Sequence, residues 1–124
     1  MSLFKDSPLV KEIGASSFTN KKLKKNLLGP SGAMVIFYGG FCGHCQRMAP
    51  EIKKFANSMG SNLKVYVIES KHQELTNRFN IQGFPTVKFA RSDGVLIPAD
   101  KFGRDIQSML NYACSKASVC KLLK

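Results

Sequence analysis

The sequence lacks a long apolar run, an internal repeat and any low-complexity linker. No stretch approaches the roughly 20 apolar residues that a helix needs to cross a bilayer, so a membrane span is not expected. Hydrophobic residues nevertheless make up 44% of the 124 residues and charged residues 22%, a balance typical of globular proteins. We therefore expect residues 1–124 to form a single domain around one hydrophobic core.

Acidic residues are few. Eight Asp and Glu stand against 19 Lys and Arg, and the resulting net charge of +11 favours acidic partners at low salt. The densest lysine cluster, KKLKK at residues 21–25, places Leu23 and Leu27 at i and i+4, so we interpret it as the solvated face of a helix. No aromatic residue is interleaved with these lysines, so a nucleic-acid site is not expected.

Neither end of the chain carries a familiar targeting signal. The opening MSLFKDSPLV has no extended apolar stretch and no small-residue cleavage pattern, so we identify no signal peptide. The chain ends in KLLK, which is not a retention tetrapeptide for the endoplasmic reticulum. The termini therefore leave the localisation unknown.

Strand-like and helix-like segments alternate along the chain, which is the pattern of an α/β domain. We expect three strands, at residues 33–38 (AMVIFY), 63–68 (LKVYVI) and 86–91 (TVKFAR). Asp93-Gly94 is a hairpin-turn signal, so residues 95–97 should pair antiparallel with the preceding strand. The sheet is therefore expected to be mixed.

Three helices are expected between and after these strands. An apolar stripe predicts a helix over residues 42–59, with a kink at Pro50. Ser70 precedes Gln73 by the spacing of a capping box, which predicts a short helix there. The last helix should begin near Arg104.

The segment CGHC places two cysteines at the start of the predicted helix. The free N–H groups and the dipole at the helix N-terminus should favour the thiolate of Cys42 and lower its pKa. Cys45 lies one turn further on the same side, where it would attack a mixed disulfide formed by Cys42. Gly43 keeps the turn small, and a protonated His44 would stabilise the thiolate and make the disulfide more oxidising. We predict a redox-active Cys42–Cys45 disulfide that needs no cofactor.

A zinc site is the structural alternative, because CxxC is also half of a zinc knuckle. The remaining ligands would be His44, His72, Cys114 and Cys120. Five residues separate the two distal cysteines, outside the usual ligand spacing, so no metal is expected. His72, beside a lysine at the start of a short helix, is interpreted as a surface residue.

The second pair of cysteines permits several interpretations. Cys114 continues the apolar stripe of the last helix, which favours a small core residue. Cys120 lies in a polar tail, where it would be free, pair with Cys114 or join another chain. Pairing within the chain would indicate an oxidising compartment.

The segments FYGGFCGHCQRMAPEI and GFPTVKF resemble the thioredoxin superfamily, and in particular a protein disulfide isomerase catalytic domain. The resemblance covers about residues 10–112 and leaves residues 113–124 as a tail. CGHC is the dipeptide variant typical of disulfide isomerases, whereas thioredoxins have CGPC. The resemblance implies a thioredoxin fold, in which about four α-helices flank a central mixed sheet.

The resemblance also implies a peptide-binding site. Phe84-Pro85 would form a cis peptide bond facing the cysteines, and the backbone before the proline would pair with an extended substrate. Phe84 would border the substrate groove. Arg104 matches an arginine that approaches the second cysteine and lowers its pKa; a solvated residue at the helix start is the alternative.

Three features depart from the family pattern. Ile36 replaces a buried acid six residues before the first cysteine, so the usual proton acceptor for Cys45 is missing and mixed-disulfide release would be slower. Gly39-Gly40 stands where Ala-Pro is common. Phe41 replaces a tryptophan, which keeps an aromatic wall for substrate without an N–H donor.

Together these features predict a thiol:disulfide oxidoreductase that forms, reduces or rearranges disulfides in cysteine-containing proteins. We expect a monomer that exchanges with glutathione or a redox partner protein. The alternatives are a thioredoxin-type reductase and a low-turnover module that binds clients or partners. The resemblance favours the secretory pathway, with a cytoplasmic or virus-encoded protein as the other options.

Overall fold

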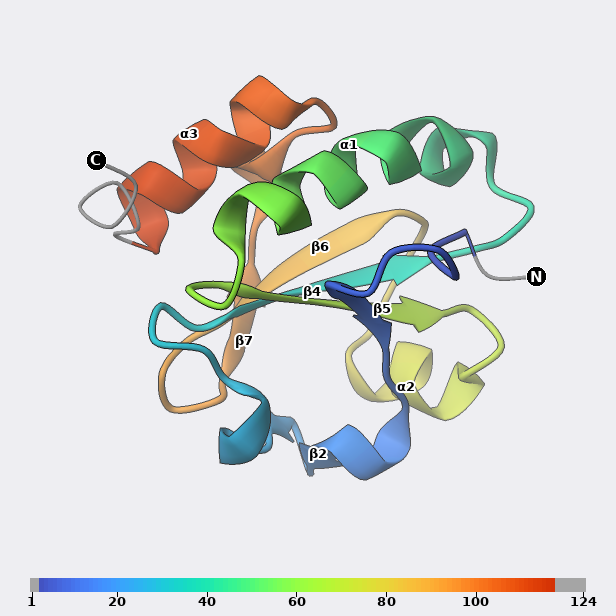
Figure 1. Cartoon of the computed structure of the whole chain (residues 1–124). Coiled ribbons are helices and arrows are strands. Elements are labelled where there is room, and N and C mark those ends of the chain that lie inside the picture. The colour runs from blue at the N-terminus through green and yellow to red at the C-terminus, as the bar shows by residue number, and fades with distance from the viewer. Residues whose placement is uncertain (1–2, 118–124) are drawn as a thin grey trace.

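Five strands form a mixed sheet in the computed structural model, which describes residues 3–117 (Figure 1). The strands are β1 (Val10–Glu12), β4 (Ala33–Tyr38), β5 (Lys64–Glu69), β6 (Thr86–Ala90) and β7 (Leu96–Pro98). Their order across the sheet is β1-β5-β4-β6-β7, with β1, β5 and β4 parallel and β6 antiparallel to both of its neighbours. The predicted mixed sheet is confirmed, and β4 has the predicted bounds.

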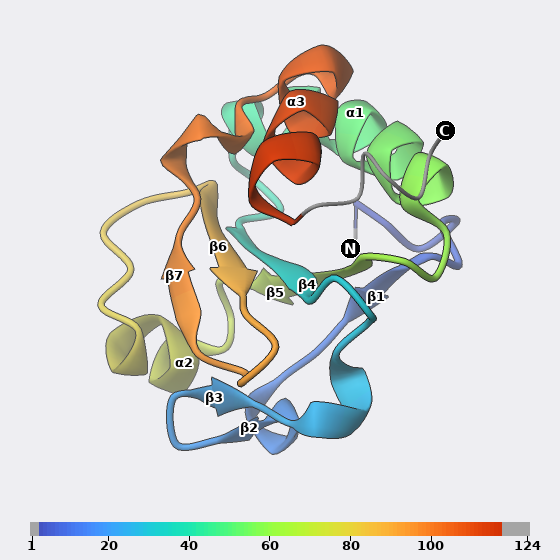
Figure 2. The ribbon, with the colours of Figure 1, turned by 90° about the vertical axis from the view of Figure 1, so that its left-hand side faces the viewer.

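Helices cover the two faces of the sheet unequally. They are α1 (Gly43–Met59), α2 (Gln73–Arg78) and α3 (Ile106–Lys116). α1 and α3 lie side by side on one face, while α2 and a small hairpin lie on the other (Figure 2). Within residues 3–117, no helix combines the length and apolar character needed to span a membrane.

Side chains of β4 alternate between two apolar clusters. Met34, Ile36 and Tyr38 face α1 and α3, whereas Ala33, Val35 and Phe37 belong to the cluster on the opposite face. All six residues are buried. This continuous apolar run reflects a strand covered on both faces, and it ends directly before the loop that leads to Cys42.

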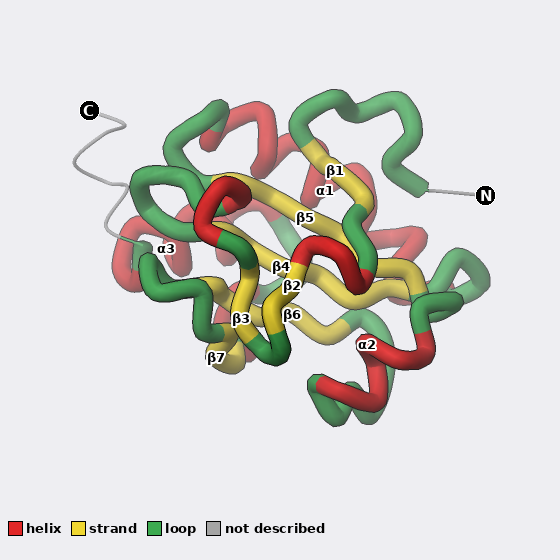
Figure 3. The backbone as a smooth tube through the Cα atoms, turned by 90° about the horizontal axis from the view of Figure 1, so that it is seen from below, coloured by secondary structure: helices red, strands yellow, loops and turns green. Residues whose placement is uncertain are grey.

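The lysine-rich segment differs from the prediction. Residues 21–25 are not helical, because Lys22–Leu23 forms β3, which pairs antiparallel with β2 (Phe18–Thr19). Leu23 is only 2% exposed and packs in the apolar cluster that also contains Phe18 and Val35, while the neighbouring lysines stay exposed. Figure 3 shows the β2–β3 hairpin lying across the central strands of the sheet. Strand alternation therefore buries the leucine and leaves the lysines in solvent. Without a helix in this segment, residues 3–117 contain three α-helices instead of the expected four or so.

The N-terminal ends of α2 and α3 also differ from the predictions. The predicted capping box at α2 is wrong, because His72 occupies the N-cap and no side chain caps that helix. His72 itself, expected on the surface, is half-buried. α3 begins two residues after Arg104, and the Asp105 side chain caps it by accepting a hydrogen bond from the Ser108 N–H.

Candidate active site

A two-glycine loop connects β4 to α1 and carries the first cysteine. The Cys42 N–H donates to the Gly39 carbonyl at 3.2 Å, which closes a tight turn. The Gln46 side-chain amide donates to the Gly40 carbonyl at 3.0 Å and ties the loop to the first turn of α1. The sequence reasoning missed Gln46; the available signal was an amide side chain four residues after Cys42.

Cys42 is the N-cap of α1, as the helix prediction required. Its Sγ accepts a hydrogen bond from the Cys45 N–H at 3.3 Å. Burial would raise the pKa of Cys42, but hydrogen bonds from the side chain and backbone of Cys45 lower it overall. The backbone of His44 and the charge of Arg104 lower the pKa of Cys42 further. This thiol is therefore prepared to react as a thiolate.

Cys45 has the opposite electrostatic setting. It is 2% exposed, and burial raises its pKa to about 11, assisted by the hydrogen bond with Cys42 and the charge of Cys42. The backbone of Gly39 and the charge of Arg104 offset only part of this rise. Ile36 is fully buried in the same apolar cluster as Cys45, and residues 3–117 contain no buried charged side chain. Cys45 thus has no buried carboxylate to take its proton.

The two cysteines should react with alkylating agents at different pH values. Because the pKa of Cys42 is lowered and that of Cys45 is about 11, brief iodoacetamide treatment of the reduced protein near neutral pH should modify Cys42 and leave Cys45 unmodified. Modification of Cys45 should rise only as the pH approaches its pKa. Peptide mass spectrometry over a pH series measures both rates. In Cys45→Ala, loss of the side-chain hydrogen bond to Cys42 should move the Cys42 profile to higher pH. Equal alkylation rates for the two cysteines in the wild type would contradict the assignment.

His44 makes a contact that the sequence reasoning missed. The Arg47 guanidinium lies 2.8 Å from His44 Nδ1, and both side chains are exposed. Because a guanidinium can only donate, Nδ1 must accept, which places the ring proton on Nε2. A Cβ at position 43 would lie 3.4 Å from Arg47 Nη1, an ordinary van der Waals contact, so this pair does not require glycine there. The protonated His44 expected from sequence would have to break this contact.

The peptide bond before Pro85 is cis and faces the reactive sulfur, as the resemblance implied. The Cys42 thiol contacts the Phe84 carbonyl oxygen at 3.5 Å, and Phe84 packs partly buried against both apolar clusters. Phe41, in contrast, projects fully into solvent, with a relative exposure of 102%. Cys42 is therefore bordered by the backbone of Phe84, and the residue before it in the chain carries an unpacked aromatic ring.

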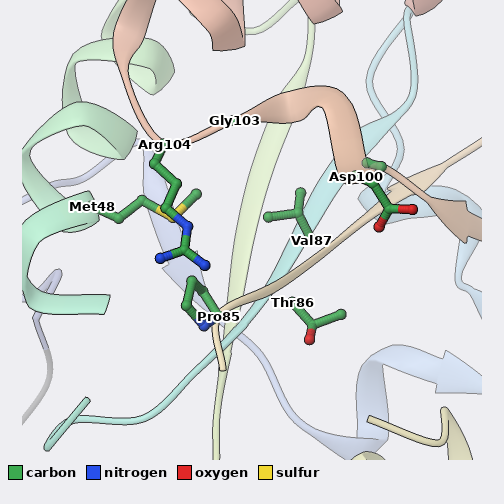
Figure 4. Close-up of a pocket in the computed structure, with 8 residues that line it drawn as sticks. Met48, Pro85, Thr86, Val87, Asp100, Gly103 and Arg104 are labelled. Atoms are coloured by element: carbon green, nitrogen blue, oxygen red, sulfur yellow. The ribbon is translucent and has the colours of Figure 1, made fainter. Parts of the chain in front are cut away.

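Arg104 lies at the same site. Its guanidinium extends over Pro85 and towards Met48 (Figure 4). Gly103 before it has φ 75°, and a Cβ there would lie 2.5 Å from the Ser108 Cβ, so only glycine permits this close turn onto α3. The turn directs Arg104 to the cysteine pair, where its charge lowers the pKa of both thiols.

The remaining predicted ligands do not join this site. Cys114 is half-buried on α3 and is disulfide-bonded, so the prediction of a small core residue is wrong. Cys120 lies outside the described residues. Across residues 3–117, no three His, Cys, Asp or Glu side chains come together in a way that could hold a metal ion.

Comparisons with known proteins agree with this geometry. The family model described as thioredoxin matches residues 14–113. The chain is 39% identical over 87 residues to protein disulfide-isomerase A6 of Mesocricetus auratus, covering 69% of this chain and 19% of that protein. It is 33% identical over 103 residues to protein disulfide-isomerase of Datisca glomerata, covering 78% and 19%. The chain thus spans about a fifth of the length of these curated relatives.

Solved structures share the fold. The J-Trx1 fragment of ERdj5 superimposes with a TM-score of 0.75 at 18% identity, covering 92% of this chain and 52% of that chain. The first thioredoxin domain of mouse protein disulfide-isomerase A4 gives a TM-score of 0.66 at 21% identity, covering 93% and 81%. The predicted thioredoxin fold is therefore confirmed, and the chain belongs to the thioredoxin family.

Proposed function

We propose that this chain is a thiol:disulfide oxidoreductase of the protein disulfide isomerase type, acting on cysteine-containing proteins. One observation carries the proposal: the half-exposed Cys42 has a lowered pKa, while the buried Cys45 three residues later has a pKa of about 11. One sulfur is thus a nucleophile and the other a protected resolving thiol. The curated relatives that carry the name protein disulfide-isomerase support this function.

The reaction has two thiol–disulfide exchange steps. The Cys42 thiolate attacks a client disulfide, forming a mixed disulfide and releasing one client sulfur as a thiolate. Cys45 then loses its proton and attacks the Cys42 sulfur, which forms the Cys42–Cys45 disulfide and frees the second client thiol. The client gains two electrons that the dithiol loses. The reverse sequence oxidises a client, and attack by another client thiolate on the mixed disulfide rearranges its bonds.

Three residues would guide the client in this scheme. An extended peptide that bonds to the backbone before Pro85 would bring its sulfur to Cys42, because the Phe84 carbonyl is 3.5 Å from Cys42 Sγ. The exposed Phe41 ring would cover apolar client side chains on the other side. Arg104, through its charge, would ease the deprotonation of Cys45.

The reduction potential separates an isomerase or oxidase from a thioredoxin-type reductase. Equilibration with reduced and oxidised glutathione, followed by mass analysis of the Cys42–Cys45 disulfide, should give a value closer to about −180 mV than to about −270 mV. His44→Pro removes a backbone N–H that lowers the pKa of Cys42, so it should destabilise the thiolate and shift the potential towards reducing values. A wild-type potential near that of thioredoxin would favour the reductase, and an unchanged potential in the variant would remove His44 as the cause.

A low-turnover binding module is the second candidate, and the setting of Cys45 favours it. A pKa of about 11 without a buried acid nearby slows the second step, so mixed disulfides would persist. Turnover of a scrambled disulfide substrate distinguishes the two functions. Ordinary turnover excludes the binding-only module, whereas stable mixed disulfides on the wild-type protein support it.

Partners and location are part of the same proposal. We place the protein in the secretory pathway, where oxidising conditions preserve disulfides, and the disulfide of Cys114 supports such a compartment. Glutathione or a redox partner protein would return the Cys42–Cys45 pair to its starting redox state after each reaction. The chain would act as a monomer, with residues 1–124 as a single domain.

A further inference from the structure

A hollow of about 220 Å³ lies beside the cis proline, on the α3 side of the reactive cysteines. Its lining includes Met48, Pro85, Thr86, Val87, Asp100 and Arg104. Figure 4 shows the Arg104 side chain at one end, directly over Pro85, and Asp100 at the other end beyond Val87. The proposed peptide site therefore continues past the cis proline into a cavity that has a cationic end.

Arg104 has no partner there. Within residues 3–117, its guanidinium forms no ion pair and no side-chain hydrogen bond. The two carboxylates close to it in the fold have other roles. Asp105 accepts hydrogen bonds from the N–H and hydroxyl of Ser108, at 2.9 and 3.1 Å. Glu51 accepts from the Ile106 N–H at 3.0 Å and from Lys54 at 3.2 Å.

The chemistry of this end of the hollow favours a carboxylate. A guanidinium presents a planar fork of donors that matches a carboxylate in a two-pronged contact. Met48 and Val87 form apolar walls on which the methylene groups of a glutamate would pack. Asp100, at the opposite end, would repel a carboxylate placed there and so restrict it to the Arg104 end.

We propose that the hollow is a client subsite, in which Arg104 binds the carboxylate of an acidic residue within two positions of the client cysteine. The inference rests on the proposed disulfide exchange at Cys42 and adds a preference among clients. It gives Arg104 a role in selecting the substrate, in addition to its electrostatic effect on the two thiols. The net charge of +11 would attract acidic clients to the protein over a long range, and Arg104 would then bind their carboxylate at one defined position.

The test compares matched peptides on a variant that cannot complete the reaction. Cys45→Ser protein is mixed with disulfide-linked dimers of a short peptide that has one cysteine and blocked termini. Eight such peptides carry Glu or Gln at one of the two positions before or the two positions after the cysteine. The rate at which the mixed disulfide with Cys42 forms is measured by mass spectrometry. At low salt, one Glu peptide should react roughly three to five times faster than its Gln counterpart, the size expected of an exposed ion pair.

Matched variants separate the subsite from general electrostatics. Arg104→Gln should reduce the Glu-to-Gln ratio to about one, and any change in Cys42 reactivity cancels because both peptides meet the same thiol. Arg104→Lys should give an intermediate ratio, since it keeps the charge and loses the fork. Lys101→Gln removes one charge from an exposed residue that does not line the hollow, so it should preserve the ratio.

The possible results distinguish failure of the subsite from failure of the proposed function. A ratio of one in the Cys45→Ser protein, or a preference that survives Arg104→Gln, would overturn the subsite and leave the proposed function intact. If the mixed disulfides form with the expected preference but the wild-type protein turns over no scrambled substrate, the proposed oxidoreductase fails and the subsite stands. No mixed disulfide with any peptide would overturn both.

Discussion

A Cys42→Ser variant is expected to lose disulfide exchange completely. The hydroxyl cannot form a disulfide, and unlike the Cys42 thiol, whose pKa is lowered, it is not ionised near neutral pH. The remaining Cys45 would not replace it, because that thiol is 2% exposed and has a pKa of about 11. Turnover of a scrambled substrate and mass analysis of trapped adducts measure the loss.

Cys45→Ser is the matched control for this variant. It keeps the attacking sulfur and removes only the resolving one, so the first step should proceed and the mixed disulfide with Cys42 should accumulate. The two variants should therefore fail at different steps. Substantial turnover by Cys42→Ser would show that Cys45 attacks clients directly, which would contradict the assigned order of the two sulfurs.

Ile36→Glu is expected to reduce stability while accelerating the second step. Ile36 is fully buried in the cluster that contains Cys45, so a carboxyl group there loses hydration without a charged partner. Such a burial costs about 2–5 kcal/mol of unfolding free energy. Because burial raises the pKa of the introduced carboxyl in the folded state, the variant should be least destabilised at low pH. Its stability should fall as the pH rises through that raised pKa. Urea denaturation at several pH values measures both effects.

The faster second step expected of Ile36→Glu also follows from the location of residue 36. A carboxyl in the apolar cluster that contains Cys45 would accept its proton during attack on the mixed disulfide, and residues 3–117 of the wild-type protein contain no buried carboxylate for this role. Samples quenched at successive times should therefore show that mixed disulfides of Ile36→Glu decay faster than those of the wild-type protein. Ile36→Gln matches the shape and polarity without accepting a proton, so it should share the loss of stability and show no faster release. Equal release rates in the Glu and Gln variants would reject proton transfer as the cause.

Much of this site could be predicted because its signals are local in sequence. The uninterrupted run of β4, the apolar stripe of α1 and the spacing of Cys42 and Cys45 place the nucleophile at the start of a helix without any tertiary information. The family motif added the cis bond at Pro85, which no local pattern determines. The strand and the helix start are confirmed because backbone periodicity and covalent spacing decide them, whereas the cis bond was predicted from the family motif alone.

The incorrect predictions concern residues whose environment is set by distant parts of the chain. Leu23 and Leu27 have helical spacing, yet the face that buries Leu23 belongs to the sheet, so a strand pair forms there instead. The contacts of Gln46 with Gly40 and of Arg47 with His44 were also missed. The first joins a side chain to a loop carbonyl, and the second joins two exposed side chains of α1. Many rotamers compete at such exposed positions, and the sequence alone ranks none of them first.

The position of β4 has a consequence for the dynamics of the reactive pair. Its backbone is hydrogen-bonded to β5 on one edge and β6 on the other, and its side chains belong to both apolar clusters. Amide hydrogens in such a strand exchange with solvent only when most of the molecule opens. The loop that ends at Cys42 starts from this strand, which we expect to be among the slowest segments to exchange. Local opening of a peripheral element such as α2 should therefore leave the attacking sulfur in register with the backbone before Pro85.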